Sequence, residues 1–343
     1  MFRSILEKVM QKQNLSNTEA EFIMNQLLCG ALTTGQMTGI LAALGVKGET
    51  PDEILAFAKV MRKHGNLVTS DRYTVDTCGT GGDGSMSFNI STAAAFVAAG
   101  AGIRVAKHGN RSVSSRCGSA DVLEALGVNI ELSPEQAEAC LKATGMAFLF
   151  APFFHPAVRN VQGARKELGV KTVFNILGPL ANPAGAAGQI VGVYSSGLVA
   201  KVAEVLRALG VDRAFVVYGE GGLDEVTLSG TTKVGYVRNG KIEYFNVTPE
   251  DFGLERYSHN AFLGGDAHEN AEIIRQILAG ERGPKRDIVV LNAAFALVAG
   301  KAAETIGDGL YLAQRSIDSG RAAEVLLDLI RFSNNFAPYT RVS

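Results

Sequence analysis

Apolar side chains recur every three or four positions through residues 1–70, which predicts consecutive helices and no strand. Three of these helices are expected to begin at a hydroxyl side chain that is followed three positions later by Glu or Gln, the spacing of a capping box. The pairs are Ser16 with Glu19, Thr33 with Gln36, and Thr50 with Glu53. The pattern therefore indicates a small N-terminal helical domain over residues 1–70.

From Tyr73 onward, short β-rich runs alternate with helical stretches, a pattern typical of βαβ units and a mainly parallel sheet. The expected strands are 73–76, 103–106, 147–150, 189–194 and 214–218. The expected helices between them are 91–99, 120–126, 133–144 and 197–209. Residues 225–248 resemble a strand pair that turns at Asn239-Gly240, and the rest of the chain returns to helix.

These patterns together predict the fold class α/β, with a second domain over residues 71–343 built on a mainly parallel central sheet. Residues 155–168 have a helical pattern, and 175–183 are dense in Gly, Pro and Asn and are expected to form a long loop. Long loops inside compact domains are often functional. We therefore expect segments near 155–185 to cross between the domains, with the ligand site in a cleft there.

Composition and charge exclude several classes of protein. Apolar residues make up 47% of the chain and charged residues 20%, which excludes a disordered or collagen-like chain. Lys plus Arg number 33 and Asp plus Glu 34, so no overall basic field exists to bind nucleic acid or an anionic membrane. Cys29, Cys78, Cys117 and Cys140 show no CxxC spacing, which favours reduced thiols in a cytoplasmic protein.

Membrane insertion and secretion are not expected from the sequence. The N-terminus lacks the continuous apolar stretch of a signal peptide. The most apolar run, 288–300, is interrupted by Asn292 and is too short to span a bilayer. We expect this run to form a buried helix.

A glycine-rich segment gives the strongest chemical signal. Residues 76–84 read DTCGTGGDG between an expected strand and a helix whose entrance carries Asn89, Ser91 and Thr92. Glycines let backbone N–H groups approach a ligand, and a helix N-terminus offers further unpaired donors, so phosphate is the favoured ligand. The spacing matches neither a Walker motif nor GxGxxG. Taken alone, it is equally compatible with a tight turn and a helix cap.

Further polar residues follow the next strand. Residues 107–115 read KHGNRSVSS, in which Lys107 and Arg111 are cations suited to phosphate. Because ligands bind at the carboxyl ends of parallel strands, this segment and the glycine-rich segment predict a joint anion site. His108 is equally compatible with a structural ring packed under the loop.

Two other features are ambiguous by themselves. The adjacent acids Asp224 and Glu225 could bind Mg²⁺ through oxygen, but such pairs are mostly solvated surface. Arg165 could hold a carboxylate with two parallel hydrogen bonds, or it could be a surface charge on its helix.

Five stretches, in this order, resemble the anthranilate phosphoribosyltransferase family of the nucleoside phosphorylase/phosphoribosyltransferase fold: 79–83, 88–92, 107–110 with 113–115, 118–127, and 175–183. The resemblance implies a Mg²⁺-dependent pentosyltransferase that joins the amine of anthranilate to C1 of 5-phosphoribosyl diphosphate (PRPP) and releases diphosphate. This reaction gives N-(5-phosphoribosyl)anthranilate, the second step of tryptophan synthesis from chorismate. The resemblance further implies a cytoplasmic homodimer without nucleic-acid or membrane partners.

The resemblance also implies roles for individual residues. Lys107 and Arg165 would be catalytic, and residues 107–115 would close as a flexible loop over PRPP. Anthranilate would be bound by Gly79, Asn110 and Arg165, and two Mg²⁺ ions by Ser91, Asp224 and Glu225. PRPP would be bound by Gly79, Gly82, Asp83, Ser87, Asn89, Ile90, Ser91, Thr92, Lys107, His108, Gly109, Asn110, Arg111, Ser112, Val113, Ser114, Ser115 and Ser119. Small departures from the family pattern at Ser87, Ser112 and Arg116-Cys117 remove no charged or metal-binding group.

The expected chemistry suits these residues. Displacement at C1 places negative charge on the departing diphosphate, which Mg²⁺, Lys107 and backbone N–H groups could neutralise. An aromatic amine is neutral at pH 7, so no strong general base is needed. Two alternatives stay open: a pyrimidine-nucleoside phosphorylase, which the Lys-His-Gly-Asn segment and the Asp-Glu pair disfavour, and a nucleic-acid-binding paralogue, which the near-neutral charge disfavours.

Overall fold

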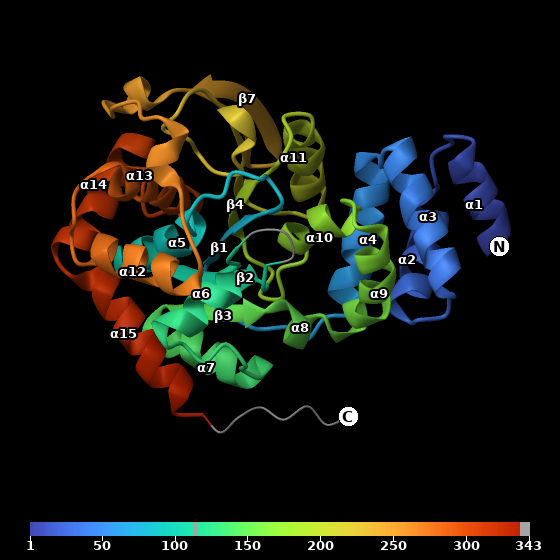
Figure 1. Cartoon of the computed structure of the whole chain (residues 1–343), viewed down its shortest axis with the longest axis horizontal. Coiled ribbons are helices and arrows are strands. Elements are labelled where there is room, and N and C mark those ends of the chain that lie inside the picture. Colours follow the sequence, from blue (N-terminus) through green and yellow to red (C-terminus); the bar gives the residue numbers. More distant parts are fainter. Residues whose placement is uncertain (113–115, 337–343) are drawn as a thin grey trace.

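The computed structural model describes residues 1–112 and 116–336 and consists of a helical part beside a larger α/β part (Figure 1). The helical part contains α1 (Phe2–Met10), α2 (Asn17–Leu28), α3 (Thr34–Lys47) and α4 (Pro51–Lys63). Helix α9 (Arg159–Leu168) comes from much later in the chain and packs on α2 and α3. The helical part is therefore built from two separate stretches of sequence.

Capping at the helix starts organises this part. All three predicted capping boxes are present, at Ser16, Thr33 and Thr50. The Glu53 side chain has a wider role: it accepts the N–H groups of Thr50 and Leu15, each at 2.8 Å, and pairs with Lys47 Nζ at 2.7 Å. Because Glu53 is 1% exposed, these bonds hold three helical segments together around one buried carboxylate.

The α/β part contains a seven-stranded sheet in the order β3-β2-β1-β4-β5-β6-β7. The first five strands in this order are parallel, and β6 and β7 are antiparallel, which confirms the predicted mainly parallel sheet. Asn239 and Gly240 have positive φ and form the predicted hairpin turn. The strands are β1 (Thr74–Gly79), β2 (Arg104–Gly109), β3 (Met146–Phe150), β4 (Gly188–Gly192), β5 (Arg213–Gly219), β6 (Thr232–Arg238) and β7 (Lys241–Val247).

The strand order reverses between β1 and β4, which lie side by side. From β1 the chain proceeds to β2 and β3 on one side, and from β4 it proceeds to β5 on the other. The connections on the two sides of this point diverge, and a crevice opens at the carboxyl ends of the two strands. The topology thus places a ligand site where Gly79 and Gly192 end their strands.

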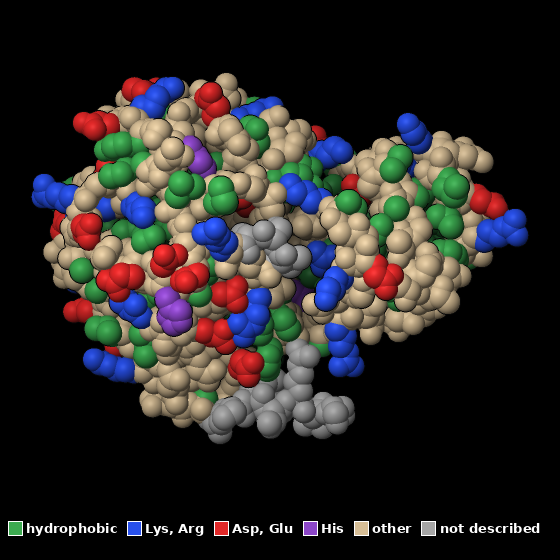
Figure 2. Space-filling view, viewed as in Figure 1, with side chains coloured by type: hydrophobic (Ala, Val, Ile, Leu, Met, Phe, Trp, Pro, Cys, Tyr) green, Lys and Arg blue, Asp and Glu red, His purple; other side chains and the backbone are tan. Residues whose placement is uncertain are grey.

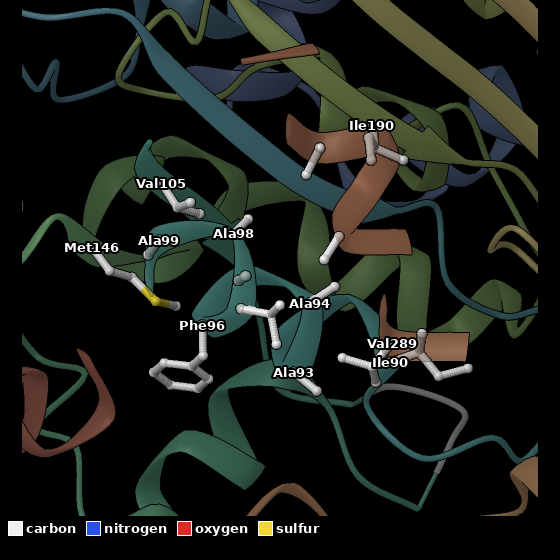
Figure 3. Close-up of a cluster of buried hydrophobic side chains, with 14 of the residues drawn as sticks. Ile90, Ala93, Ala94, Phe96, Ala98, Ala99, Val105, Met146, Ile190 and Val289 are labelled. Atoms are coloured by element: carbon white, nitrogen blue, oxygen red, sulfur yellow. The ribbon is translucent and has the colours of Figure 1, made fainter. Parts of the chain in front are cut away.

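Helices cover both faces of the sheet. Helices α5 (Ile90–Gly100) and α13 (Pro284–Ala299) contact one face, and α11 (Leu198–Ala208) contacts the other. Figure 3 shows the small side chains of α5 gathered with Val105, Met146, Ile190 and Val289 from β2, β3, β4 and α13. Their size lets α5 lie close to the strands, so that its N-terminus reaches the crevice.

The remaining helices are α6 (Ser119–Leu126), α7 (Pro134–Thr144), α8 (Ala151–Phe154), α10 (Phe174–Leu180), α12 (Ala267–Leu278), α14 (Ile306–Asp318) and α15 (Arg321–Asn334). The expected buried helix at 288–300 is confirmed as α13. Within residues 1–112 and 116–336, no helix is long and apolar enough to cross a membrane.

Two expectations about local structure are wrong. Residues 175–183 are not one long loop, because Phe174–Leu180 form helix α10 with Pro179 inside it. Burial of Phe174, Leu177 and Leu180 overrides the low helix propensity of this segment. The strand expected from residue 225 begins only at Thr232, because side chains rather than a neighbouring strand bond the backbone before it.

A close helix contact at Gly100 gives a test of this packing. A Cβ at Gly100 would lie 2.7 Å from the backbone nitrogen of Ala322 in α15. We expect Gly100→Ala to lower the free energy of unfolding by about 1–3 kcal/mol, measured by urea denaturation. Gly39→Ala in α3 is the control, since nothing lies within 4 Å of its added Cβ. It should raise that free energy by about 0.5–1 kcal/mol; equal effects of the two changes would contradict the packing argument.

Candidate active site

The two acids that follow β5 lie against the glycine-rich segment at the crevice. One Asp224 carboxylate oxygen accepts the N–H of Gly81 at 2.9 Å. One Glu225 oxygen accepts the N–H of Ser91 at 3.0 Å, at the N-terminus of α5. The structure therefore brings the acid pair next to the glycine-rich segment, although the two are more than a hundred residues apart in sequence.

Glycine is required where the acids enter. A Cβ at Gly79 would collide with the Asp224 side chain, and a Cβ at Gly192 would collide with the Asp224 backbone. The two glycines are partners in the β1–β4 register, so they form one bare patch on the sheet. Gly192 was not identified from the sequence; only the pairing of β1 with β4 reveals its part in the site.

The acids carry more negative charge than their surroundings compensate. Burial, followed by the nearby Asp83, raises the pKa of Asp224 to about 7. Burial and the adjacent Asp224 raise the pKa of Glu225 to about 8, although Lys107 opposes this. Both acids are half-buried rather than fully solvated, and a cation beside them would relieve the repulsion.

The donor set fits Mg²⁺ that is completed by water and phosphate. Among the described residues, no three His, Cys, Asp or Glu side chains form a closed metal cage. Mg²⁺ characteristically takes one or two protein carboxylates and keeps its other positions for water and substrate phosphate. Asp224 and Glu225, with the hydroxyl of Ser91 next to them, supply hard oxygen donors of that kind.

Lys107 does not lie in a flexible loop, contrary to the prediction. It belongs to β2, is 2% exposed, and donates from Nζ to the carbonyl of Thr77 and to the Ser91 hydroxyl, the latter at 3.3 Å. Burial lowers its pKa, while the negative charge of Asp76 opposes the shift. The ammonium group is thus held at the start of α5, beside the acid pair.

His108 and Gly109 also belong to β2 rather than to a loop. His108 Nδ1 lies 3.0 Å from the carbonyl of Gly178, and its ring packs edge-on against His155 with centroids 5.1 Å apart. Burial lowers the pKa of His108 to about 3 and that of His155 to about 4. These contacts favour the structural alternative for His108.

The segment after β2 is turned toward α6 in this structure. Arg111 pairs with Asp121 and Glu124, so its guanidinium is not free for phosphate here. The Asn110 carbonyl accepts the Ser119 hydroxyl at 3.3 Å, and Ser112 donates its N–H to Asp121 at 3.0 Å. Val113, Ser114 and Ser115 lie outside the described residues.

The other predicted PRPP residues divide into two groups. Gly82, Asp83, Ser87 and Asn89 lie on the connection from β1 to α5, where Gly82 has φ 68°. The side chains of Ile90 and Thr92, by contrast, are 1% exposed, and their part in binding PRPP stays a prediction. Sequence alone could not show which side of α5 faces the crevice.

Asn89 connects the start of α5 to the segment that precedes α6, and it also bonds to Asn270, a residue that was not predicted. Its Nδ2 donates to the carbonyl of Cys117 at 3.3 Å, and its Oδ1 accepts from Asn270 Nδ2 at 3.0 Å. Asn270 in turn accepts the N–H of Gly265 at 2.8 Å. Nothing local in the sequence around Asn270 indicates this role.

Arg165 comes from the helical part, on α9. Its guanidinium lies 5.2 Å from the ring centroid of Phe174, and burial lowers its pKa. No acidic partner is found for it among the described residues. Figure 2 shows the surface indented between the helical part and the α/β part, as expected for a cleft that two lobes share.

Comparison with known proteins agrees with this geometry. The family model "Glycosyl transferase family, a/b domain" matches residues 71–323, and "Glycosyl transferase family, helical bundle domain" matches residues 3–65. The anthranilate phosphoribosyltransferase of Pelotomaculum thermopropionicum is 53% identical over 338 residues, covering 98% of each chain. The chain belongs to the anthranilate phosphoribosyltransferase family.

Solved structures of anthranilate phosphoribosyltransferases are also similar to the chain. The enzyme from Thermus thermophilus superposes with a TM-score of 0.91 at 43% identity, covering 96% of this chain and 99% of that one. The Saccharomyces cerevisiae enzyme, solved in complex with PRPP and Mg, gives a TM-score of 0.89 at 30% identity and covers 98% of each chain. The predicted family and pentosyltransferase activity are confirmed over the nucleoside phosphorylase and nucleic-acid-binding alternatives.

The segment after α9, which contains Leu180 and Asn182, connects the helical part and the α/β part through hydrogen bonds. Arg62 Nε of α4 donates to the carbonyl of Leu180 at 2.8 Å. Asn182 Nδ2 donates to Asp76 at 2.7 Å and to the carbonyl of Ala106 at 2.8 Å. The other Asp76 oxygen accepts the N–H of His108 at 3.2 Å. A continuous path of bonds thus runs from the helical part to β1 and β2.

The buried histidines predict how stability depends on pH. His155 is neutral in the folded state down to its pKa of about 4, whereas the unfolded chain takes up the proton near pH 6.5. Stability from this group is therefore present above pH 6.5 and falls as the pH drops toward 4, by up to about 1.4 kcal/mol per pH unit. We expect His155→Gln to flatten this dependence in urea denaturation between pH 7 and pH 4.5. The exposed His268→Gln is the control, and an unchanged slope in His155→Gln would contradict the argument.

Proposed function

We propose that the crevice at the carboxyl ends of β1 and β4 binds PRPP with Mg²⁺, and that Arg165 presents anthranilate to it from the helical part. The observation that carries the proposal is the placement of Asp224 and Glu225 against the glycine-rich segment and the N-terminus of α5. Acids in that position would repel a bare diphosphate, and a divalent cation held by Asp224 and Glu225 would remove this repulsion.

The diphosphate of PRPP would occupy the space between the glycine-rich segment and the start of α5. Backbone N–H groups after β1 and the hydroxyl and amide groups of Ser87, Asn89 and Ser91 would supply donors there. The residues from Asn110 to Ser115, together with Ser119, would cover the ligand from the neighbouring strand. Arg111 would have to leave Asp121 and Glu124 to take part, so its contribution depends on rearrangement after binding.

Mg²⁺, when bound, neutralises the negative charge that the departing diphosphate acquires. Ser91, Asp224 and Glu225 would hold it, and we propose two ions. Separate positions are supported by the different directions of the two acids, one toward Gly81 and the other toward Ser91. Lys107 adds a fixed positive charge beside them, so that less charge must be reorganised during the reaction.

Anthranilate would bind with its carboxylate on Arg165, assisted by Gly79 and Asn110. Arg165 suits this role because it is half-buried and no acid among the described residues competes for it. The Saccharomyces cerevisiae relative has been solved in complex with 4-fluoroanthranilate. The aromatic amine brings its own lone pair, so the chain's task at this end is orientation rather than proton removal.

The assembly would be a cytoplasmic homodimer with domains at 1–70 and 71–343 and crossing segments near 155–185. The contacts of α9 with α2 and α3 support the crossing. Sedimentation of the purified chain at several concentrations tests the dimer directly.

The absence of tryptophan from the chain makes the overall proposal simple to test. Anthranilate is fluorescent, so its consumption can be followed against a low protein background. Purified protein with PRPP should consume anthranilate when Mg²⁺ is present and stop when the metal is chelated. No consumption at any Mg²⁺ concentration would refute the proposed function.

The acid pair provides a sharper test. We expect the double change Asp224→Asn with Glu225→Gln to lower turnover by at least about a hundredfold, because two hard anionic ligands are lost. The fold should persist, since the amide oxygens can still accept the N–H groups of Gly81 and Ser91. A magnesium titration with matched thermal melts measures both effects, and overlapping titration curves would reject the metal role.

The proposed role of Arg165 predicts different effects of its removal on the KM values of the two substrates. We expect Arg165→Ala to raise the KM for anthranilate by about ten- to a hundredfold and to leave the KM for PRPP nearly unchanged, since a charged hydrogen-bond pair contributes about 1.5–3 kcal/mol. Lys166→Ala is the matched control, because Lys166 is its exposed neighbour on the same helix. Equal losses for both substrates would argue against a dedicated anthranilate role.

A further inference from the structure

The only polar side chain in the buried stretch of α13 from Ile288 to Ala299 is that of Asn292, which is 2% exposed. Its Oδ1 accepts the N–H of Val226 at 2.9 Å, and its Nδ2 donates to the carbonyl of the same residue at 2.9 Å. The second proton of Nδ2 goes to the carbonyl of Ile288 at 2.8 Å. The Asn292 side chain thus bonds both the N–H and the carbonyl of Val226, the residue directly after Glu225.

We propose that Asn292 is a positioning residue that sets the acid pair in the crevice, an inference that rests on the metal role proposed above. Residues 223–231 belong to no strand, so the backbone of Val226 lacks the ladder bonds that would otherwise fix it. Asn292 supplies both bonds in their place, as a strand neighbour would.

The position of Val226 is transmitted directly to the acids. Val226 is fully buried, so its side chain is anchored as well as its backbone. Glu225 is bonded on its other side to the N–H of Ser91, and it lines a narrow pocket together with Thr77, Ser91 and Asn292. The acid is therefore held between two helix elements, with α5 bonding its carboxylate and α13 bonding the adjoining peptide groups.

We expect a shift of the Asp224–Glu225 segment to weaken metal binding. Groups that orient metal ligands without touching the metal characteristically change metal affinity or activity by about ten- to a hundredfold when they are removed. Asn292→Leu keeps the size of the side chain but removes both bonds to Val226. Freed from them, the Asp224–Glu225 segment can shift relative to Gly79 and Ser91.

The test measures metal binding directly, with Mn²⁺ as the probe. Free Mn²⁺ is followed by electron paramagnetic resonance in titrations of wild type, Asn292→Leu, and the Asp224→Asn with Glu225→Gln variant, each with saturating PRPP. We expect Asn292→Leu to weaken Mn²⁺ binding by about ten- to a hundredfold. Hydrogen exchange at the Val226 amide should be faster in the same variant.

Ser316→Ala is the matched control for a merely structural effect. Ser316 is equally buried and donates to the carbonyl of Val97 at 2.7 Å, on the helix pair α14–α5 away from the acids. It should lower thermal stability while binding Mn²⁺ as wild type does. If Asn292→Leu fails to fold, Asn292→Ser, which leaves room for water at Val226, makes the same comparison.

The outcomes separate this inference from the metal role itself. Weaker Mn²⁺ binding in both the Asn292 and the acid-pair variants supports the inference. Wild-type Mn²⁺ binding by folded Asn292→Leu, together with loss of binding in the acid-pair variant, overturns it and leaves the metal role intact. Wild-type binding by the acid-pair variant overturns both.

Discussion

Two carboxylates held against the N-terminus of a helix and the end of a parallel strand impose the main constraint on this structure. Water is partly excluded around Asp224 and Glu225, and burial raises both pKa values. Protein groups must therefore take over the hydrogen bonds that water would make. The N–H groups of Gly81 and Ser91 do so. Gly81 lies in the connection after β1, outside the strand ladder, and Ser91 lies in the first turn of α5, where a helix leaves its first donors unpaired.

Other features of the fold follow from that requirement. The acids can approach the sheet only because Gly79 and Gly192 lack side chains. Helix α5 can bring its N-terminus to them because its alanines allow close packing between the sheet and α13. The ammonium of Lys107, fixed by the Thr77 carbonyl, balances part of the charge without entering solvent. Close packing therefore brings the acid pair, the N-terminus of α5 and the ammonium of Lys107 into one site.

The helical part matters because the second substrate group comes from it. Arg165 lies on α9, which packs with α2 and α3, whereas the acids lie on the connection between β5 and β6 of the α/β part. Arg62, Asn182 and Asp76 join the two parts through bonds to one crossing segment. The spacing between the carboxylate-binding and phosphate-binding ends of the cleft therefore depends on this polar path, and Arg62, Asn182 and Asp76 were not among the predicted site residues.

The sequence by itself determined the helical start, the parallel sheet, the hairpin turn at Asn239-Gly240 and the family, because these depend on short-range periodicity, caps and motifs. It also identified Asp224, Glu225 and Arg165 as candidates. Tertiary structure alone decided that Lys107 and His108 are buried in a strand, that the side chains of Ile90 and Thr92 are buried, and that α10 is helical despite its proline. It likewise revealed Gly192, Asn270 and Asn292. The physical reason is the same in each case. Burial and long-range hydrogen bonds depend on which distant segments contact one another, and the local sequence pattern does not determine those contacts.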